Sequence, residues 1–435
     1  MKTKLLNKIK SNKASVGIIG LGYVGLPLAI RFFEENINVV GLDIDDKKTK
    51  TLQEGNSYIN HIDARKISKM ISSGKFIPST DFKLILDVDI IIICVPTPLG
   101  PHNEPNLSYI ENTLKLIKPF LKKDQLLVLE STTYPGTTDE VIIPYIQDLG
   151  FKIGEDFFIG YSPEREDPGN KDFTTKTIPK VVSGHSENCL NLTDFIYQKI
   201  VDETVPVSST KVAEMTKIME NIHRSVNIGL VNELKIVADK MNIDIYEVIN
   251  AAATKPFGFT SFYPGPGLGG HCIPIDPFYL TWKAKEVGMN TRFIELAGEI
   301  NTSMPDYVIH KISKTLNLVQ KSVKNSKILV LGLAYKKNVD DVRESPSMEI
   351  INKLSSMDAD IYFNDPFFDK FPETRKLNIE VPYLELSKDT LNDMDLVLLV
   401  TDHDQFDYQL ILKEAKMIID TRGRYNFFDE KIVKA

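Results

Sequence analysis

Short apolar runs alternate with longer amphipathic stretches through the first half of the chain. From Ala14 the order is an apolar strand, a glycine turn, a helix and a second strand, written in the sequence as SVGIIG, LGYVGLPLAIRFFEEN and INVVGLDID. Further runs typical of buried strands follow at DIIIICVP, LLVLEST and FFIGYSPE, with helical stretches between them. This order predicts a doubly wound parallel α/β domain over residues 1–206, with its ligand edge at the carboxyl ends of the strands.

The pattern changes at Ser208, where a long stretch begins with no Gly or Pro before the isolated Gly229. Its apolar residues recur at helical spacing, at Val212, Met215, Met219, Ile222 and Val226. A helix of about 30 residues would be roughly 45 Å long. We expect it to be the spine of a helical middle domain over residues 207–322, and its long apolar stripe predicts a homodimer or a larger homo-oligomer.

A second strand and glycine turn begin near Lys327, in SKILVLGLAYKK, and the later strand ADIYFNDP again ends in an aspartate. Only Gly332 stands where the first turn has three glycines, so the internal repeat is weak. Strands are also expected in MDLVLLVT and AKMIIDT. Residues 323–435 therefore predict a second, degenerate Rossmann-like domain, which gives two Rossmann-like doubly wound parallel-sheet domains joined by the long helix and the middle domain.

Composition narrows the choice of partners and compartment. The formal net charge of −7 gives no global attraction to nucleic acid, so a local site must supply positive charge for any anionic ligand. The longest apolar run, Ile90–Val95, is too short to span a membrane, and the lysine-rich N-terminus lacks the features of a secretory signal. The three widely spaced cysteines, Cys94, Cys189 and Cys272, predict a reducing, cytoplasmic location with neither a disulfide framework nor a metal site.

The first glycine turn carries the pattern of a dinucleotide site. Its cofactor-binding candidates are Gly20, Gly22, Tyr23, Val24 and Gly25 in GLGYVG, followed by Asp43 at the end of the next strand. The glycines permit a tight turn and close approach of a pyrophosphate, and Asp43 can accept hydrogen bonds from the ribose hydroxyls. The acid favours NAD over NADP, although Lys48 could pair with a phosphate or with the ribose.

Polar residues follow three further strands. Thr97 in CVPTP and Thr132 in ESTTYPG are expected at the ligand edge, but turn chemistry alone explains isolated hydroxyls equally well. YSPEREDPGN places Glu164 and Arg165 beyond the next strand end. Charged turns are usually solvated, and Glu164 is the residue of this turn that we expect to face the site.

The long helix presents a polar stripe, because Lys217, Asn221 and Arg224 fall at positions i, i+4 and i+7. Such a stripe could simply be exposed. Two cations and an amide together could instead stabilise an oxyanion or bind phosphate.

One cysteine lies in a loop rich in glycine and proline, GPGLGGHCIPIDP from Gly265 to Pro277. Cys272 could be a small buried hydrophobic residue, but the glycines around it favour exposure to a ligand. A cation such as Lys217 would lower the pKa of its thiol and raise its nucleophilicity. Asp276 before Pro277 also suits the start of a helix, so it could serve structure and chemistry together.

Taken together, these residues resemble the UDP-glucose/GDP-mannose dehydrogenase family, and within it the branch that acts on N-acetylhexosamines, closest to oxidation of UDP-N-acetylglucosamine for surface polysaccharides such as O-antigen. The resemblance rests on GLGYVGLPLA, VPTP, ESTTYPGTT, YSPEREDPGN, STKVAEMTKIMENIHR, FYPGPGLGGHCIPIDPFYL and LAYKKNVDDVRESPS, which span nearly the whole chain in family order. It implies a four-electron oxidation of the sugar C6 alcohol of a UDP-sugar to a carboxylate, with two NAD+ used in succession.

The resemblance also implies roles for single residues. Cys272 would capture the aldehyde as a thiohemiacetal that becomes a thioester. Lys217 and Asn221 would stabilise oxyanions, while Asp276 and Thr132 would handle water and protons. The implied substrate-binding residues are Glu164, Arg165, Lys217, Asn221, Arg224, Tyr263, Gly265, Gly267, Gly269 and Lys336, and Arg343 would approach the cofactor.

One position departs from the family pattern. Many glucose-type members have a second glutamate four residues after the one that matches Glu164, and here that position is Pro168. Two other functions stay open at this point: a two-electron hydroxyacid dehydrogenase, which needs no cysteine, and a non-catalytic NAD-binding regulator, which needs none of Lys217, Cys272 and Asp276.

Overall fold

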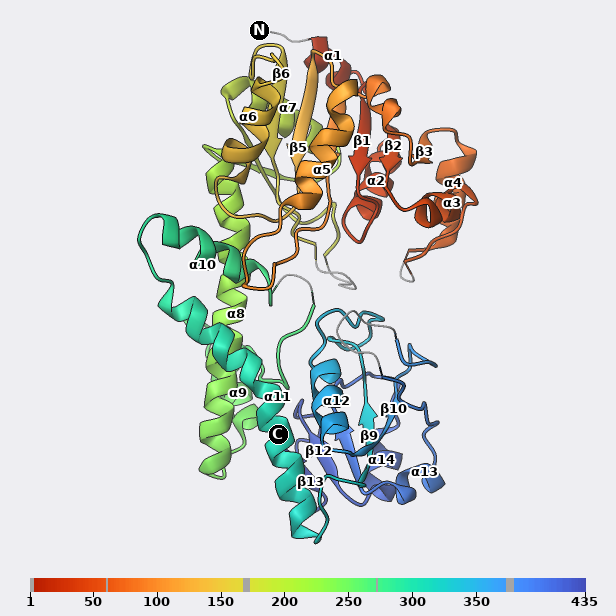
Figure 1. Cartoon of the computed structure of the whole chain (residues 1–435), viewed down its shortest axis with the longest axis vertical. Coiled ribbons are helices and arrows are strands. Elements are labelled where there is room, and N and C mark those ends of the chain that lie inside the picture. The colour runs from red at the N-terminus through yellow and green to blue at the C-terminus, as the bar shows by residue number, and fades with distance from the viewer. Residues whose placement is uncertain (1–3, 60–61, 167–172, 271–272, 373–378) are drawn as a thin grey trace. The chain divides into compact units, whose positions relative to one another are not determined.

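A computed structural model describes residues 4–59, 62–166, 173–270, 273–372 and 379–435 of the chain, and its elements are drawn in chain order in Figure 1. Contacts divide the chain into two compact units. The first contains Met1–Glu220 and Phe278–Met289, and the second contains Asn221–Pro277 and Asn290–Ala435. The domain limits expected at 206/207 and 322/323 stay predictions.

The first unit is built on an eight-stranded sheet with the order β3-β2-β1-β4-β5-β6-β7-β8. Neighbouring strands are parallel except β6 and β7, which are antiparallel. The strands are β1 Ser15–Ile19, β2 Asn38–Leu42, β3 Phe76–Ser79, β4 Ile90–Ile93, β5 Gln125–Leu129, β6 Phe157–Tyr161, β7 Lys180–Gly184 and β8 Thr204–Pro206. The predicted doubly wound parallel domain is confirmed.

Helices cover both faces of this sheet. Ile90 and Ile92 of β4 belong to the core beneath α1, α2 and α7, whereas Ile91 and Ile93 belong to the core beneath α5 and α6. A strand buried on both faces explains the unbroken apolar run in its sequence. The helical elements are α1 Lys4–Lys10, α2 Gly25–Glu34, α3 Asp46–Gln53, α4 Ala64–Ser72, η1 Phe82–Asp87, α5 Ser108–Ile117, η2 Lys118–Phe120, η3 Thr138–Ile142, α6 Ile143–Gln147 and α7 Glu187–Tyr197.

The predicted spine helix is α8, Thr210–Lys240, a continuous helix of 31 residues that belongs to the first unit up to Glu220 and to the second from Asn221. It is followed by α9 Ile245–Ala253, α10 Asp276–Glu286 and α11 Arg292–Leu318. In the second unit α8 and α11 approach closely at Gly229, where an added Cβ would lie 3.1 Å from Ala297. The glycine inside the helical pattern therefore serves helix packing.

The second unit carries a five-stranded, fully parallel sheet with the order β10-β9-β11-β12-β13. Residues of α11 and α12 pack on one face, and residues of α13 and α14 on the other. The bounds are β9 Lys327–Leu331, α12 Pro346–Ser356, β10 Asp360–Asn364, α13 Lys388–Asp393, β11 Leu396–Leu399, α14 Tyr408–Glu414, β12 Ile418–Asp420 and β13 Ile432–Lys434. The expected second Rossmann-like sheet is confirmed.

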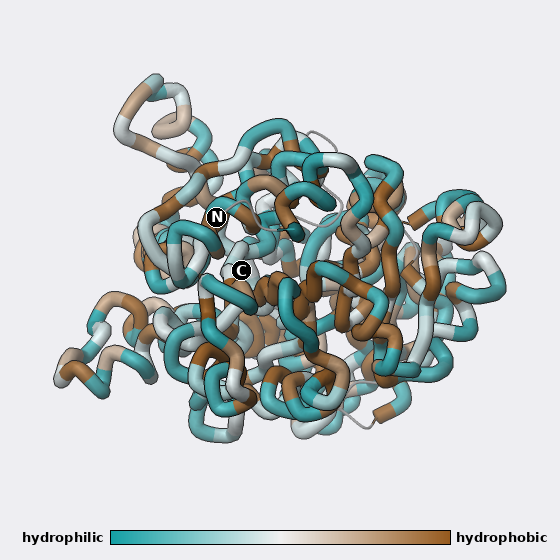
Figure 2. Tube along the Cα trace, turned by 90° about the horizontal axis from the view of Figure 1, so that it is seen from above, coloured by the Kyte–Doolittle hydropathy of each residue, from teal (hydrophilic) through white to brown (hydrophobic). Residues whose placement is uncertain are grey.

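Hydrophobic and hydrophilic segments alternate along the Cα trace in Figure 2. Among the described residues no helix is long and apolar enough to cross a membrane. Likewise, the described residues contain no group of three or more His, Cys, Asp or Glu side chains arranged to hold a metal ion.

Candidate functional site

The first glycine turn joins β1 to α2, and two of its glycines are required by close contacts. Gly20 has φ +94°, and a Cβ there would lie 2.6 Å from the carbonyl oxygen of Cys94. A Cβ at Gly25 would lie 1.9 Å from the carbonyl oxygen of Gly20. At Gly22, an added Cβ would have no atom of the other described residues within 4 Å, its chain neighbours apart, so the middle of the turn is open to a ligand.

The start of α2 suits an anion. Val24 occupies the N-cap position of α2 and makes no side-chain cap, whereas the Asp45 side chain caps α3 and the Asp63 side chain caps α4. Uncapped backbone N–H groups and the helix dipole favour a phosphate at this point. Val24 and the partly buried Tyr23 complete the predicted turn.

Asp43 follows β2 and is almost fully buried. Its Oδ2 accepts the backbone N–H of Leu21 at 2.9 Å, and its Oδ1 accepts that of Asp45 at 3.0 Å. Lys48 lies 3.5 Å from Oδ2. The carboxylate is thus held by the backbone beside the glycine turn, as a ribose-binding acid requires, and these residues fit NAD.

The two predicted threonines meet at neighbouring strand ends. The hydroxyl of Thr97 donates to the carbonyl of Thr132 at 2.7 Å, and the hydroxyl of Tyr279 donates to the carbonyl of Thr97. The Thr97 side chain is therefore used to join two loops, which favours the turn interpretation for it. The Thr132 side chain is partly exposed.

Glu214 on α8 fixes the loop after Thr132, a role that its sequence pattern does not indicate. Its carboxylate accepts the backbone N–H groups of Gly136 at 2.5 Å and Thr138 at 2.9 Å, and the Thr138 hydroxyl at 2.7 Å. Burial raises the pKa of Glu214 to about 7 in spite of these hydrogen bonds. The sequence marks Glu214 only as a polar position of the helix, so its burial and its partners become evident only from the contacts in the structure.

Glu164 lies beyond β6 and is held on both oxygens. Its Oε1 accepts the N–H groups of Arg165 and Glu166, both at 2.7 Å, and its Oε2 lies 2.8 Å from Nζ of Lys180. Burial favours the protonated acid, but Lys180 and the backbone donors outweigh it and lower the pKa of Glu164. The predicted site residue is a fixed carboxylate.

The Arg165 side chain is paired with Glu220 and with a backbone carbonyl. Its guanidinium lies 2.7 Å from a carboxylate oxygen of Glu220 on α8 and donates to the carbonyl of Pro179 at 2.7 Å. These contacts tie the turn to α8. A substrate-binding role for Arg165 stays a prediction.

The polar stripe of α8 is divided by burial. Lys217 and Asn221 are buried, whereas Arg224 is exposed. Nδ2 of Asn221 donates to Oδ2 of the buried Asp276 at 2.5 Å, which attaches the end of the cysteine loop to the helix. Cys272 itself, with His271, lies outside the described residues, so its distance from Lys217 stays open.

The loop before Cys272 makes close contacts with other parts of the second unit. The Gly265 N–H donates to Oδ1 of Asn232 at 3.0 Å, and a Cβ at Gly265 would lie 2.9 Å from a nitrogen of Arg422. A Cβ at Gly269 would lie 2.5 Å from Cβ of Tyr335. Asn232 and Arg422 carry no signal of this contact in the sequence.

The remaining predicted residues of the second unit lie around the same loop. Gly267 has φ +142°, and a Cβ there would lie 3.1 Å from Pro346. Tyr263 is about half exposed and donates its hydroxyl to Asn250. Lys336 follows the second turn and is partly buried.

Arg343 contributes to the loop through its backbone, because its carbonyl accepts the N–H of Gly270 at 2.9 Å. Its guanidinium forks onto Asp341, with Nε 3.0 Å from Oδ1 and a terminal nitrogen 2.7 Å from Oδ2. An approach of this guanidinium to the cofactor stays a prediction.

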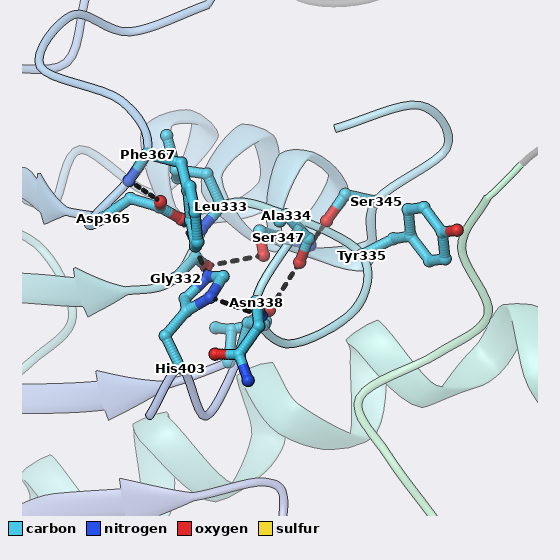
Figure 3. A network of polar contacts seen from close by, with 12 residues as sticks. Gly332, Leu333, Ala334, Tyr335, Asn338, Ser345, Ser347, Asp365, Phe367 and His403 are labelled. Atoms are coloured by element: carbon cyan, nitrogen blue, oxygen red, sulfur yellow. Dashed lines mark hydrogen bonds and ion pairs between the residues drawn. The ribbon is translucent and has the colours of Figure 1, made fainter. Parts of the chain in front are cut away.

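At the second glycine turn, the carboxylate of Asp365 is bound by groups of the protein itself (Figure 3). Asp365 accepts the N–H of Leu333 at 2.6 Å and that of Phe367 at 2.8 Å. Nε2 of the fully buried His403 lies 3.2 Å from the same carboxylate, while its Nδ1 accepts the N–H of Asn338 at 2.9 Å. The carboxylate of this turn is therefore enclosed by side chains of its own domain.

Comparison with known proteins assigns the chain to a family. Family models of the UDP-glucose/GDP-mannose dehydrogenases match the NAD-binding domain at residues 14–201, the central domain at 211–303 and the UDP-binding domain at 329–427. The chain belongs to this family. It is an NAD-dependent oxidoreductase that acts on a nucleotide sugar, and not a hydroxyacid dehydrogenase or a non-catalytic regulator.

Several relatives resemble this dehydrogenase to a similar degree, and those named for a sugar do not all name the same one. Protein CapL of Staphylococcus aureus is 35% identical, covering 95% of this chain and 96% of its own. A UDP-N-acetyl-D-glucosamine 6-dehydrogenase of Pseudomonas aeruginosa is 36% identical over 81% of this chain and 82% of its own. The structure of a UDP-D-ManNAc dehydrogenase from Pyrococcus horikoshii superposes with a TM-score of 0.86 at 29% identity, covering 97% and 98% of the two chains.

Proposed function

We propose that this enzyme oxidises the C6 alcohol of UDP-N-acetylglucosamine to the carboxylate of the corresponding uronic acid. The observation that carries the proposed oxidation is the buried hydrogen bond between Asn221 and Asp276. It attaches Asp276, near the end of the GGHCIPIDP loop, to α8 four residues after Lys217. A relative that bears the name of this activity spans most of the chain. UDP-N-acetylmannosamine is the second candidate, because relatives and solved structures carry that name. UDP-N-acetylgalactosamine and UDP-glucose are further alternatives.

The proposed reaction has two oxidations linked by Cys272. Bound NAD+ supplies the hydride acceptor for each of them. The Sγ of Cys272 adds to the aldehyde carbon formed by the first oxidation, the second oxidation converts this thiohemiacetal to a thioester, and water cleaves the thioester to free thiol and carboxylic acid. One alcohol, two NAD+ and one water thus give one carboxylic acid, two NADH and two protons.

The remaining groups act on charge and water. Lys217 and Asn221 stabilise the oxyanions that form at C6, since buried donors act strongly where water is excluded. Asp276 holds the Asn221 amide and, together with Thr132, handles the attacking water and its protons. Glu164 contributes a fixed carboxylate, and no second acid follows at Pro168.

Replacement of Cys272 by Ala tests the covalent mechanism. UDP-sugar and NAD+ binding should survive, because the glycine loop is unchanged, while uronic acid formation falls by orders of magnitude. The wild type should form about two NADH per acid with little free aldehyde. A near-wild-type rate of acid formation by Cys272→Ala would refute the proposal.

A panel of UDP-sugars tests the substrate. We expect a higher kcat/KM for UDP-N-acetylglucosamine than for UDP-N-acetylmannosamine, UDP-N-acetylgalactosamine or UDP-glucose, with the uronic acid identified by mass spectrometry. A preference for any of the other three sugars would overturn this part of the proposal and leave the oxidation itself in place.

We also propose that the enzyme is a homodimer in the cytoplasm and feeds surface-polysaccharide synthesis, including that of O-antigen. An apolar stripe on α8 is exposed within the chain, at Val212, Met215, Met219, Leu230, Leu234 and Val237, and the exposed Met241 follows directly after the helix. Such a stripe favours a second copy as its cover. Sedimentation as a monomer at micromolar concentration would contradict the dimer, and Leu234→Asp should weaken it. Free Cys94 and Cys189 fit a reducing compartment.

A further inference from the structure

A buried lysine lies where three strands of the first sheet meet. Glu130 follows β5 and Glu164 lies beyond β6, so both are at the carboxyl edge of the sheet. Because β7 is antiparallel to β6, its first residue, Lys180, is at the same edge. The side chains of Glu130, Lys180 and Glu164 are 0%, 4% and 13% exposed.

One ammonium is shared by two carboxylates. Nζ of Lys180 lies 2.8 Å from Oε2 of Glu164 and 3.1 Å from Oε2 of Glu130. The other oxygen of Glu130 accepts the hydroxyl of Tyr197, whose ring centroid is 5.3 Å from the lysine Nζ. The other oxygen of Glu164 accepts two backbone N–H groups. Each carboxylate oxygen therefore has a donor.

The charges in this cluster do not balance when both acids are ionised. Burial, reinforced by Glu164, raises the pKa of Glu130 to about 7 against the effect of Lys180, whereas the pKa of Glu164 is lowered. Burial opposes the charge of Lys180, but the two acids prevail and raise its pKa. The titratable groups that face one another here are Cys94, Glu130, Glu164, Glu166, Lys180 and Tyr197.

We propose that Lys180 is a positioning residue for the proposed sugar oxidation: it holds Glu164 as a fixed anion, and Glu130 competes for its charge. This inference rests on the proposed function for its catalytic consequence. When Glu130 carries a proton, the ammonium serves Glu164 alone. When Glu130 is ionised, the ammonium is divided between the two acids. The alternative is an ion cluster that only stabilises the fold.

Kinetics against pH separate these two roles. An opposite charge within hydrogen-bonding distance lowers a carboxylate pKa by about one to three units, so Lys180→Met should move the acid limb of kcat/KM for the UDP-sugar upward by about that much. Lys180→Arg keeps the cation and should restore the limb. Glu130→Gln removes the competing anion and should leave the limb at the wild-type pH or below it.

Two controls guard against general damage. Lys176→Met removes a half-exposed lysine of the same unit, which lies 3.9 Å from Asp202, and should leave the pH profile unchanged. Binding of NAD+ should persist in Lys180→Met, because Asp43 and the glycine turn follow β2 and β1, which β4 separates from β5, β6 and β7 in the sheet. If Lys180→Met does not fold, the double variant Glu130→Gln/Lys180→Met leaves one acid to neutralise and should still show the upward shift.

Infrared spectroscopy of the carboxyl groups gives a readout independent of activity. In the wild type, the protonated carboxyls of Glu130 and Glu214 should both titrate near neutral pH, and the Glu130 contribution should be lost in Glu130→Gln while that of Glu214 remains. Lys180→Met should show an additional protonated carboxyl from Glu164. Activity lost equally at every pH, or no additional carboxyl band, would overturn the inference. A wild type inactive on all UDP-sugars, with both bands as expected, would overturn the proposed function alone.

Discussion

The two glycine turns of the chain share one backbone arrangement and differ in what surrounds their carboxylates. In each turn an aspartate at the end of the second strand accepts two backbone N–H groups. They are those of Leu21 and Asp45 for Asp43, and those of Leu333 and Phe367 for Asp365. The strand, turn and carboxylate are therefore a structural frame that does not by itself make a dinucleotide site.

The remaining partner of each carboxylate decides its availability. Asp365 has His403, which is fully buried and fixed on its other ring nitrogen by the N–H of Asn338. Asp43 has Lys48, whose side chain is 36% exposed and 3.5 Å away. A ribose can displace a flexible lysine far more easily than a buried ring, so only the first turn presents an acid to a ligand.

The glycines of the two turns also favour the first turn as the ligand site. Gly20 and Gly332 both have positive φ and lie against the backbone of a neighbouring strand end. In the same register, Ala334 stands where the first turn has Gly22 and Lys337 where it has Gly25. The second turn keeps the glycine that the fold requires and lacks the glycine that leaves room for a pyrophosphate.

The largest contrast is expected from removing the two acids. Asp43→Ala should raise the Kd for NAD+ about 100-fold, because the ribose and the turn both lose hydrogen bonds to a charged group. Asp365→Ala should leave that Kd within about twofold while lowering Tm, because two buried N–H groups and His403 lose their partner. Calorimetric NAD+ titration with thermal unfolding measures both. Equal loss of NAD+ affinity in the two variants would break the comparison.

Gly22→Ala should make the first turn resemble the second. Apart from its chain neighbours, the new Cβ meets no atom of the described residues within 4 Å, so Tm should change little. It would occupy the approach of the pyrophosphate, and the Kd for NAD+ should rise about 10-fold or more. Gly25→Ala is the matched control, because its Cβ would collide with the Gly20 carbonyl and should impair folding as well. Unchanged NAD+ affinity in Gly22→Ala would show that the open space is not the cofactor site.

His403→Ala should affect stability and not the cofactor. Loss of the ring leaves the buried Asp365 carboxylate and the Asn338 N–H without this partner, at a cost of about 1–3 kcal/mol, seen as a lower Tm. The KM for NAD+ should stay within about twofold. His185→Ala, at a half-exposed histidine, is the control and should leave Tm almost unchanged. A changed KM for NAD+ in His403→Ala would link the second turn to the cofactor.

Much of the fold could be predicted from the sequence because its signals are local. The glycine turn, the buried strand Ile90–Ile93 and the uninterrupted stretch of α8 each specify an element within one window of residues. The second sheet followed in the same way from its strands and from Gly332. How these elements divide into compact units depends on contacts between distant segments, and α8 belongs to both units.

The site was less predictable because burial and pairing are long-range properties. Spacing placed Lys217, Asn221 and Arg224 on one helical face, but burial separates Arg224 from the other two. Nothing around Lys180 in the sequence indicates that it is shared by two acids from other strands. Lys235 likewise looks like a surface residue of α8, yet its amine is buried with no hydrogen-bond partner among the described residues, and burial lowers its pKa to about 7.

The smallest effect is expected from Lys48→Met, which tests whether the partner of Asp43 is replaceable. The Lys48 side chain is partly exposed and lies 3.5 Å from Asp43, so the pair contributes little. Tm should change little, in contrast to the loss of His403, and the KM for NAD+ should change by less than about threefold. If Lys48 can also pair with a phosphate, the variant should lose residual activity with NADP+ more than activity with NAD+. Steady-state kinetics with both cofactors measure the difference. A large loss with NAD+ would mean that Lys48 is as fixed a partner as His403, and the availability of Asp43 would then need another cause.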